Sequence, residues 1–201
     1  MRLNKKQIKI CAWASDYINH PGSWVVLDTE TTGLGTNDEV IEIAIVSSSG
    51  NILFSSLIQP EEVHRTDLAT HIHGITTEML RTAPTFPDVW PIIKAVLRRY
   101  RHVVVYNAAF DHRLLEGTAQ RYGYILPSAS WDCAMEAYAL YHGAWNDYFQ
   151  SYTWQRLQVA CTRLGVPPIG NYHRATADTL STLGVLRALA SRLDQEGEVQ
   201  A

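Results

Sequence analysis

Two carboxylates follow an apolar run near the start of the chain, and they constrain the fold more than any other feature. The run, Trp24–Leu27, is typical of a buried strand that ends at about Asp28. Strand side chains alternate between two faces, so Asp28 and Glu30 should point to the same side. Adjacent carboxylates repel each other unless a cation lies between them, and oxygen ligands suit Mg²⁺ or Mn²⁺. Taken alone, the stretch is more simply interpreted as a solvated strand end that runs into a turn.

The order of the predicted elements indicates one α/β domain. We expect strands at 24–28, 40–46, 52–58 and 102–106, two short helices within 61–81, and longer helices at 4–19, 85–101, 108–122, 132–142, 153–164 and 176–193. The turn at 47–51 should join the second and third strands into an antiparallel hairpin, which makes the sheet mixed. Helices on the faces of such a sheet are typical of a single α/β domain.

Composition and charge exclude several classes of protein. The chain of 201 residues is 46% apolar and 18% charged, as in soluble globular proteins, and it lacks a run of about 18 apolar residues. Its start lacks the apolar core of a signal peptide. Three scattered cysteines, Cys11, Cys133 and Cys161, argue for a reducing compartment, so we expect a cytoplasmic protein without a membrane partner. The net charge of −3 argues against a protein that coats DNA, but not against an enzyme that grips a few phosphates.

Three further candidate catalytic or metal-binding residues lie far downstream, each near the expected end of a helix or strand. Asp111 lies where the fourth strand gives way to a helix, which is where open α/β sheets place their sites. Asp178 falls in the first turn of the last helix, and His173 lies in the loop before it. Each alone is explained by the helix dipole or by a surface histidine. Together with Asp28 and Glu30, they suit two divalent cations and a general base.

These residues lie in three ordered motifs that resemble the DEDDh branch of the 3′→5′ exonucleases, a family that includes polymerase proofreading subunits. The motifs are Leu27–Leu34, Asn107–Asp111 and His173–Asp178, and His73–Thr76 matches a further element of the family. The match extends over about Trp24–Leu189. The resemblance implies an α/β, ribonuclease-H-like fold, in which helices flank a mixed central sheet of three antiparallel strands plus parallel strands.

The resemblance also implies a role for each matching residue. Asp28 would bridge two Mg²⁺ or Mn²⁺ ions. Glu30 and Asp178 would hold the ion on the nucleophile side, and Asp111 would hold the other. His173 would act as the general base. The walls of the pocket for the terminal nucleotide would be Thr31, Leu34, Ile72, His73, Asn107 and Phe110.

The function implied by the resemblance is a metal-dependent 3′→5′ exonuclease that releases nucleoside 5′-monophosphates, with DNA as the expected substrate. Two alternatives stay open: an enzyme that trims RNA 3′ ends, and a proofreading subunit that acts mainly as a polymerase partner. The expected partner is a nucleic acid with a free 3′ end. Association with a polymerase or with a second copy of the chain is undetermined at this stage.

Two stretches match no part of the family pattern. Residues 1–22 should form a helical extension before an exonuclease domain at 23–195, which a short tail at 196–201 would follow. The stretch Gly143–Tyr152 is rich in aromatic residues. Exposed aromatic rings there could stack on bases, and filling the flank of the sheet is the alternative.

Overall fold

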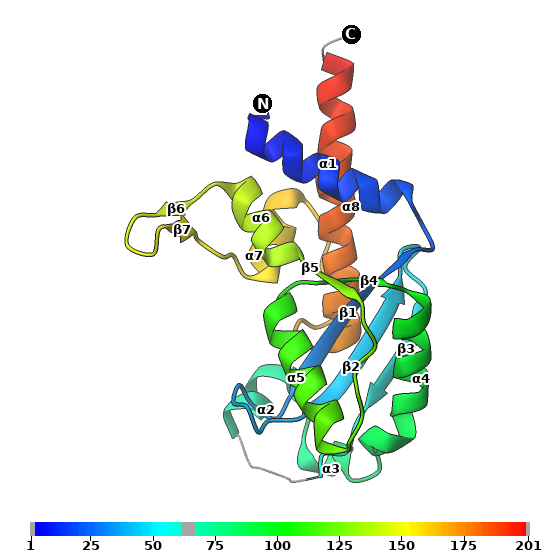
Figure 1. Cartoon of the computed structure of the whole chain (residues 1–201). Coiled ribbons are helices and arrows are strands. Elements are labelled where there is room, and N and C mark those ends of the chain that lie inside the picture. The colour runs from blue at the N-terminus through cyan, green and yellow to red at the C-terminus, as the bar shows by residue number, and fades with distance from the viewer. Residues whose placement is uncertain (1–2, 62–66, 200–201) are drawn as a thin grey trace.

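The centre of the molecule is a mixed five-stranded sheet (Figure 1). A computed structural model describes residues 3–61 and 67–199, with only the backbone described at 67–68 and 194–199. The strands of the sheet are β1 Trp24–Thr31, β2 Val40–Ser47, β3 Ile52–Leu57, β4 His102–Val105 and β5 Ser130–Cys133. Their order is β3-β2-β1-β4-β5, with β1 to β3 antiparallel and β4 and β5 parallel to β1. The predicted fold class is confirmed.

Helices cover both faces of this sheet. They are α1 Lys5–Asn19, α2 Asp67–His73, α3 Thr77–Leu80, α4 Phe86–Arg99, α5 Ala108–Arg121, α6 Ala134–His142, α7 Leu157–Leu164 and α8 Ala175–Val199. Helices α4 and α5 pack on one face, and α1, α6, α7 and α8 build the core on the other. Figure 1 shows the long helix α8 crossing the sheet and continuing past its edge beside α1. Within the described residues, no helix is both long enough and apolar enough to cross a membrane.

Strand β1 is buried on both faces, which explains its continuous apolar start. Val25 and Leu27 point into the core beneath α4 and α5, whereas Trp24 and Val26 point into the core beneath α8. The alternation of side chains then places the carboxylates at positions 28 and 30 on the α8 face. The apolar core on this face therefore gives way to acid side chains within the same strand.

The boundaries of β1 and α6 differ from the sequence-based prediction. We predicted that the first strand ends at Asp28, but it continues to Thr31, because residues 28–31 pair with β2. We also predicted a helix from position 132, but that helix begins at Ala134. Residues 130–133 instead form β5, whose pairing with β4 overrides the local helical pattern.

Two helix boundaries also differ from the prediction. Helix α7 begins at Leu157 rather than at 153, and α8 extends over 175–199 rather than 176–193. The aromatic stretch contains a second small sheet, formed by β6 Trp145–Asn146 and β7 Ser151–Tyr152. The two short helices predicted within 61–81 are confirmed as α2 and α3, although positions 62–66 of that range lie outside the described residues.

The N-terminal helix packs against the body of the molecule. Asn4 caps it, since the Asn4 side chain accepts two backbone hydrogen bonds from the first turn and its own N–H donates to the Gln7 side chain. At the other end, the Tyr17 hydroxyl donates to Asp132 on β5, and the Trp24 indole donates to the Tyr17 carbonyl. These contacts attach most of the predicted extension to the sheet.

Candidate active site

Three acids meet at one end of the sheet, where two neighbouring strands finish. Asp28 and Glu30 lie in the second half of β1, and Asp111 lies in the first turn of α5, the helix that follows β4. Because β4 runs parallel to β1, the ends of the two strands lie side by side. Asp111 Oδ1 accepts hydrogen bonds from Thr29 N at 2.9 Å and from Thr29 Oγ1 at 2.7 Å. The residue between the two β1 acids therefore fixes the third acid beside them.

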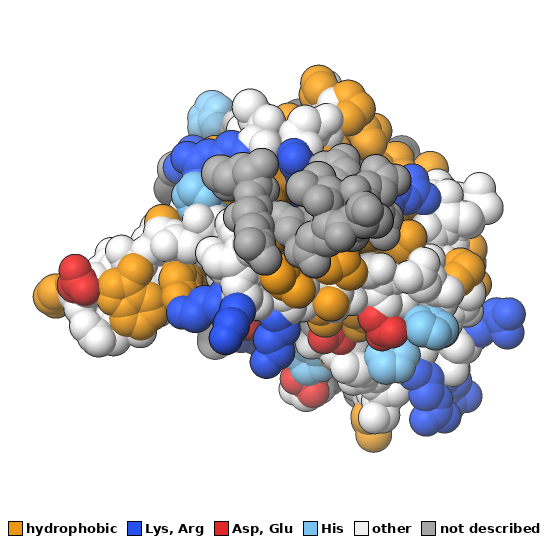
Figure 2. Space-filling model, turned by 90° about the horizontal axis from the view of Figure 1, so that it is seen from above, with side chains coloured by type: hydrophobic (Ala, Val, Ile, Leu, Met, Phe, Trp, Pro, Cys, Tyr) orange, Lys and Arg blue, Asp and Glu red, His pale blue; other side chains and the backbone are white. Residues whose placement is uncertain are grey.

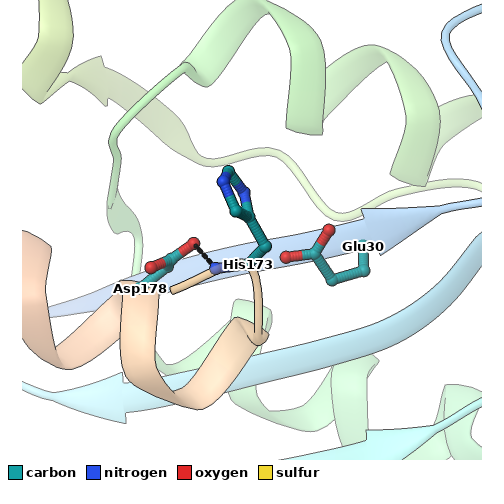
Figure 3. A group of neighbouring side chains, drawn as sticks. All are labelled: Glu30, His173 and Asp178. Carbon is teal, nitrogen blue, oxygen red and sulfur yellow. Dashed lines mark hydrogen bonds between the residues drawn. The ribbon is translucent and has the colours of Figure 1, made fainter. Parts of the chain in front are cut away.

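The start of α8 adds a fourth acid and a histidine. Asp178 is buried, and its Oδ2 accepts a hydrogen bond from the backbone N–H of His173 at 3.0 Å (Figure 3). His173 has a φ of 62°, a left-handed conformation that non-glycine residues rarely adopt. Ligand atoms of Glu30, His173 and Asp178 all lie within 4.8 Å of one another. The bend at position 173 thus brings the loop back over its own helix and toward β1.

Burial raises the pKa of all four acids, and repulsion from other acids of the cluster adds to the rise for Asp28, Glu30 and Asp111. Burial raises the pKa of Glu30 to about 8, and the charges of neighbouring acids, Asp178 foremost, add to the rise. Burial also raises the pKa of Asp111 to about 7, although the hydrogen bonds from Thr29 oppose the rise. The pKa of Asp28 lies well above its ordinary value because of burial and the nearby charges of Asp111 and Glu30. Burial raises the pKa of Asp178 as well. Without a counterion, this cluster is costly to ionise.

The cluster fits divalent cations on two observations. First, all four acids supply oxygen donors, which Mg²⁺ and Mn²⁺ prefer. Second, Asp178 Oδ1 is buried and has no hydrogen-bond partner among the described residues. A buried carboxylate oxygen without a partner is unfavourable unless something positive lies beside it. Bound cations would both neutralise the cluster and use this oxygen.

The four acids and the histidine that are predicted to be catalytic share one cleft of about 590 Å³. Its lining includes the four acids and His173, and also three of the residues predicted to hold a nucleotide: Ile72, Asn107 and Phe110. Further lining residues were not predicted from the sequence: Thr29, Tyr106, Met135, Trp154, Gln155, Arg156, Leu157, Gln158 and Tyr172. Tyr106 and Tyr172 directly precede motif residues, so adjacency was an available signal. The segment 154–158 offered none, because only the tertiary fold brings it to the cleft.

A larger hollow of about 760 Å³ lies elsewhere, beside α4 and the segment 123–128. Its lining in the described part of the chain has three basic residues, Lys94, Arg98 and Arg101, and no carboxylate or histidine. It lacks the groups that hydrolytic chemistry needs, so the smaller cleft is the candidate active site.

Three residues predicted for the nucleotide pocket do not appear among the described residues that line the cleft. Thr31 is buried, and its hydroxyl donates to the Gly33 carbonyl. His73 is buried too, its Nδ1 accepts a hydrogen bond from Ile75 N, and burial lowers its pKa. Leu34 is 78% exposed on the loop after β1. Their contact with a substrate stays a prediction.

A family comparison agrees with this geometry. The model of the exonuclease (RNase T) family matches residues 25–186, which include every acid of the cluster and His173. The chain belongs to the DEDDh exonuclease family. An uncharacterized exonuclease, CP81, of Escherichia phage 186 is 40% identical to this exonuclease over 173 residues, which are 83% of this chain and 87% of the phage protein.

Solved structures agree as well. Exonuclease X in complex with 5′ overhanging duplex DNA is 25% identical, with a TM-score of 0.60 over 89% of this chain and 99% of that chain. The nuclease domain of 3′hExo, a DEDDh family member bound to rAMP, is 19% identical, with a TM-score of 0.62 over 89% of this chain and 94% of that one. The second likeness concerns the fold alone, and both neighbours have the ribonuclease-H-like architecture.

Proposed function

We propose that this protein is a metal-dependent 3′→5′ exonuclease that removes nucleoside 5′-monophosphates from the 3′ ends of DNA. The observation that carries the proposal is the convergence of four carboxylates and His173 on one cleft. Membership of the exonuclease family supports the reaction class.

Two divalent cations, Mg²⁺ or Mn²⁺, fit the cluster. Asp28, Glu30 and Asp178 would hold one of them, and Asp28 and Asp111 would hold the other. When bound, such ions lower the pKa of water and stabilise charge on the phosphoryl group and on the leaving oxygen. The backbone N–H groups of Thr29 and His173 orient Asp111 and Asp178 for this task.

His173 would take the proton from the attacking water. It lies on a loop at the cleft, near Glu30 and Asp178, where a general base can reach the water. The water oxygen forms a bond to phosphorus while the bond from phosphorus to the 3′ oxygen of the preceding nucleotide breaks. The products are a nucleoside 5′-monophosphate and a strand with a new 3′-hydroxyl.

The terminal nucleotide would lie against the apolar and amide side chains of the cleft. Phe110 offers a ring face, Ile72 offers an apolar wall, and Asn107 offers an amide that can form hydrogen bonds. Phe110 and Asn107 lie within one turn of Asp111, so a nucleotide that contacts them would have its phosphate near the acids.

DNA is the preferred substrate in this proposal. Its support is the likeness to Exonuclease X, which spans nearly the whole of that chain and reaches 25% identity in a structure that contains duplex DNA. The RNA-trimming alternative has weaker support, since the neighbour bound to rAMP is only 19% identical.

A direct test uses DNA and RNA oligonucleotides of one sequence, each labelled at the 5′ end, with Mg²⁺. We expect a ladder of progressively shorter 5′-labelled DNA, slower loss of RNA, and no reaction in excess EDTA. A 3′-phosphate should block the reaction, whereas a 5′-phosphate should not. Immediate release of the 5′ label, or cutting of a circular single strand, would contradict the proposed direction. Faster loss of RNA would favour the alternative substrate.

A further inference from the structure

A hairpin rich in exposed aromatic side chains projects from the body of the protein. We call residues 143–154, which include β6 and β7, the aromatic arm; Figure 1 shows it extending beyond α6 and α7, away from the sheet. Tyr148 at its tip is 87% exposed, Phe149 is 70% exposed and Trp154 at its base is 63% exposed. The alternative that these rings fill the flank of the sheet is therefore wrong. Burying such rings would be favourable, so their exposure suggests a binding surface.

The tip of the arm is held in a defined shape. The Asn146 side chain accepts hydrogen bonds from the backbone N–H groups of Tyr148 and Phe149. The two tip rings contact each other edge to face, with centroids 4.9 Å apart. At the base, Thr153 N donates to the Ala144 carbonyl and closes the hairpin. The rings are thus presented at low entropic cost to a partner.

The arm is continuous with the candidate active site. Trp154 at its base lines the cleft, together with Arg156 two residues further on. A strand whose 3′ end occupies the cleft would therefore have the arm as one neighbouring surface for the nucleotides before that end. This continuity argues for the substrate itself as the occupant of the arm.

The charge around the arm suits a polyanion. From Gly143 to Arg163 the sequence has one acid, Asp147, and two arginines, although the whole chain has a net charge of −3. Arg156 forms no ion pair with a carboxylate of the described residues. Lys6 of α1 lies over the Tyr152 ring, 4.9 Å from its centroid, and contacts its hydroxyl. Figure 2 shows hydrophobic side chains on the protruding part, with Lys and Arg side chains between it and the centre of the molecule.

We propose that the aromatic arm binds the unpaired nucleotides upstream of the 3′ end, by stacking their bases on its exposed rings. Flat aromatic rings beside basic side chains are the common means of gripping single strands without reading sequence. The inference rests on the proposed function for the identity of the ligand. It extends that function to a substrate class: strands with a single-stranded 3′ segment of several nucleotides. It also gives α1 a role, since this helix supplies Lys6 to the base of the arm.

The experiment measures binding separately from hydrolysis. Fluorescence anisotropy would follow oligodeoxythymidylates of about four and about twelve nucleotides, and a twelve-nucleotide strand that is abasic upstream of its last two positions. The protein would carry Asp28→Asn, in EDTA, so that no strand is cut. The double variant Tyr148→Ala/Phe149→Ala would be compared with Ile125→Ala. Ile125 is a matched control, because it is an equally exposed apolar side chain that lines the larger hollow away from the cleft.

We expect the double substitution to weaken binding of the long strand roughly tenfold or more, since stacking on one ring is worth about that factor. The preference for the intact strand over the abasic strand should disappear, and Ile125→Ala should change neither value. Equal binding of intact and abasic strands by the protein with the arm intact would overturn the proposal. So would arm substitutions that leave binding unchanged but abolish self-association in sedimentation, which would assign the arm to a protein partner. Absence of cleavage by the unsubstituted protein with Mg²⁺ would instead contradict the proposed function, and the binding data would still decide the role of the arm.

Discussion

Arg174 forms a bidentate ion pair with Glu42, which lies on β2 directly opposite Glu30 of the active site. Its Nη2 lies 2.6 Å from Glu42 Oε1, and its Nε donates to both carboxylate oxygens at 3.1 Å. Glu42 Oε2 also accepts a hydrogen bond from Ala175 N, the first residue of α8. One buried carboxylate thus holds both the loop and the helix that carry His173 and Asp178.

This ion pair should position the site rather than take part in the reaction. We expect Arg174→Ala to lower the free energy of unfolding by about 2 kcal/mol, because it leaves Glu42 buried without its charged partner. The single-turnover rate with saturating Mg²⁺ should fall as well, since the loop that carries the general base loses its anchor. Arg174→Lys should give intermediate values, because lysine keeps the charge but lacks the planar fork.

Arg187→Ala is the matched control for this ion pair. Arg187 lies on α8 and donates to the Ser48 carbonyl, and neither residue lines the cleft. Its removal should leave the rate unchanged. A rate for Arg174→Ala equal to that of the control, measured at saturating metal, would show that the ion pair has a purely structural role.

The acids of the site were predictable from the sequence because each lies near an element end. In the fold, the parallel pairing of β1 and β4 brings Asp28 and Glu30 close to Asp111. The start of α8 then adds Asp178 to the same cleft. Glu42 was not predictable in this way, since it lies within the apolar strand β2 and its partner is 132 residues away. Glu42 is a charged residue in a strand that is buried along its whole length, and only the structure shows that Arg174 neutralises it.

Strand pairing explains the differences at β1 and β5. The polar residues 28–31 have no local strand pattern, and they extend β1 only because β2 provides hydrogen-bond partners. Residues 130–133 form β5 because they pair in parallel with β4. Such long-range pairing overrides local propensity and is not visible in a short window of sequence. The same holds for the segment 154–158, which reaches the cleft through the path of the aromatic arm.

The stability of the metal-free protein should depend on pH in a characteristic direction. The folded state raises the pKa of Glu30 to about 8 and of Asp111 to about 7, above the ordinary carboxyl values. The folded state therefore binds these protons more tightly than the unfolded chain does. That contribution to stability is present in acid, below the ordinary carboxyl pKa, and is lost as pH rises through about 7 to 8.

Thermal melts in EDTA would measure this effect. We expect the Tm to fall as pH rises from about 5.5 to about 8.5, and Mg²⁺ or Mn²⁺ to raise the Tm more at the alkaline end. Glu30→Gln, which removes one of the titrating charges, should flatten the profile. A Tm in EDTA that is constant over this range would show that the folded state does not raise the pKa of these acids.

Asp28→Asn should abolish activity without loss of stability in the absence of metal. The substitution removes a charge that lies beside Asp111 and Glu30, so the metal-free protein should melt at the same temperature or higher. The stabilisation by Mn²⁺ should decrease sharply, because an amide is a poorer ligand than a carboxylate. Differential scanning calorimetry with and without Mn²⁺ checks both values.

Asp16→Asn, at an exposed acid of α1, is the control for this comparison. It should retain activity and the full response to metal. A large drop in Tm for metal-free Asp28→Asn would assign Asp28 a structural role instead.

His173→Asn should remove the general base and keep the backbone. The φ of 62° at this position is tolerated better by asparagine than by alanine, and the N–H that donates to Asp178 is retained. We expect turnover to fall by about 10²–10⁴-fold, whereas stabilisation by Mn²⁺ should stay close to that of the unsubstituted protein, since the acids hold the ions. Single-turnover rates at saturating metal, together with the Tm with and without Mn²⁺, measure these two effects. His173→Ala should behave similarly in rate but melt at a lower temperature, which separates the lost base from the strained backbone. If His173→Asn instead loses its response to Mn²⁺ as fully as Asp28→Asn, the imidazole is a metal ligand and the proton goes to another acceptor.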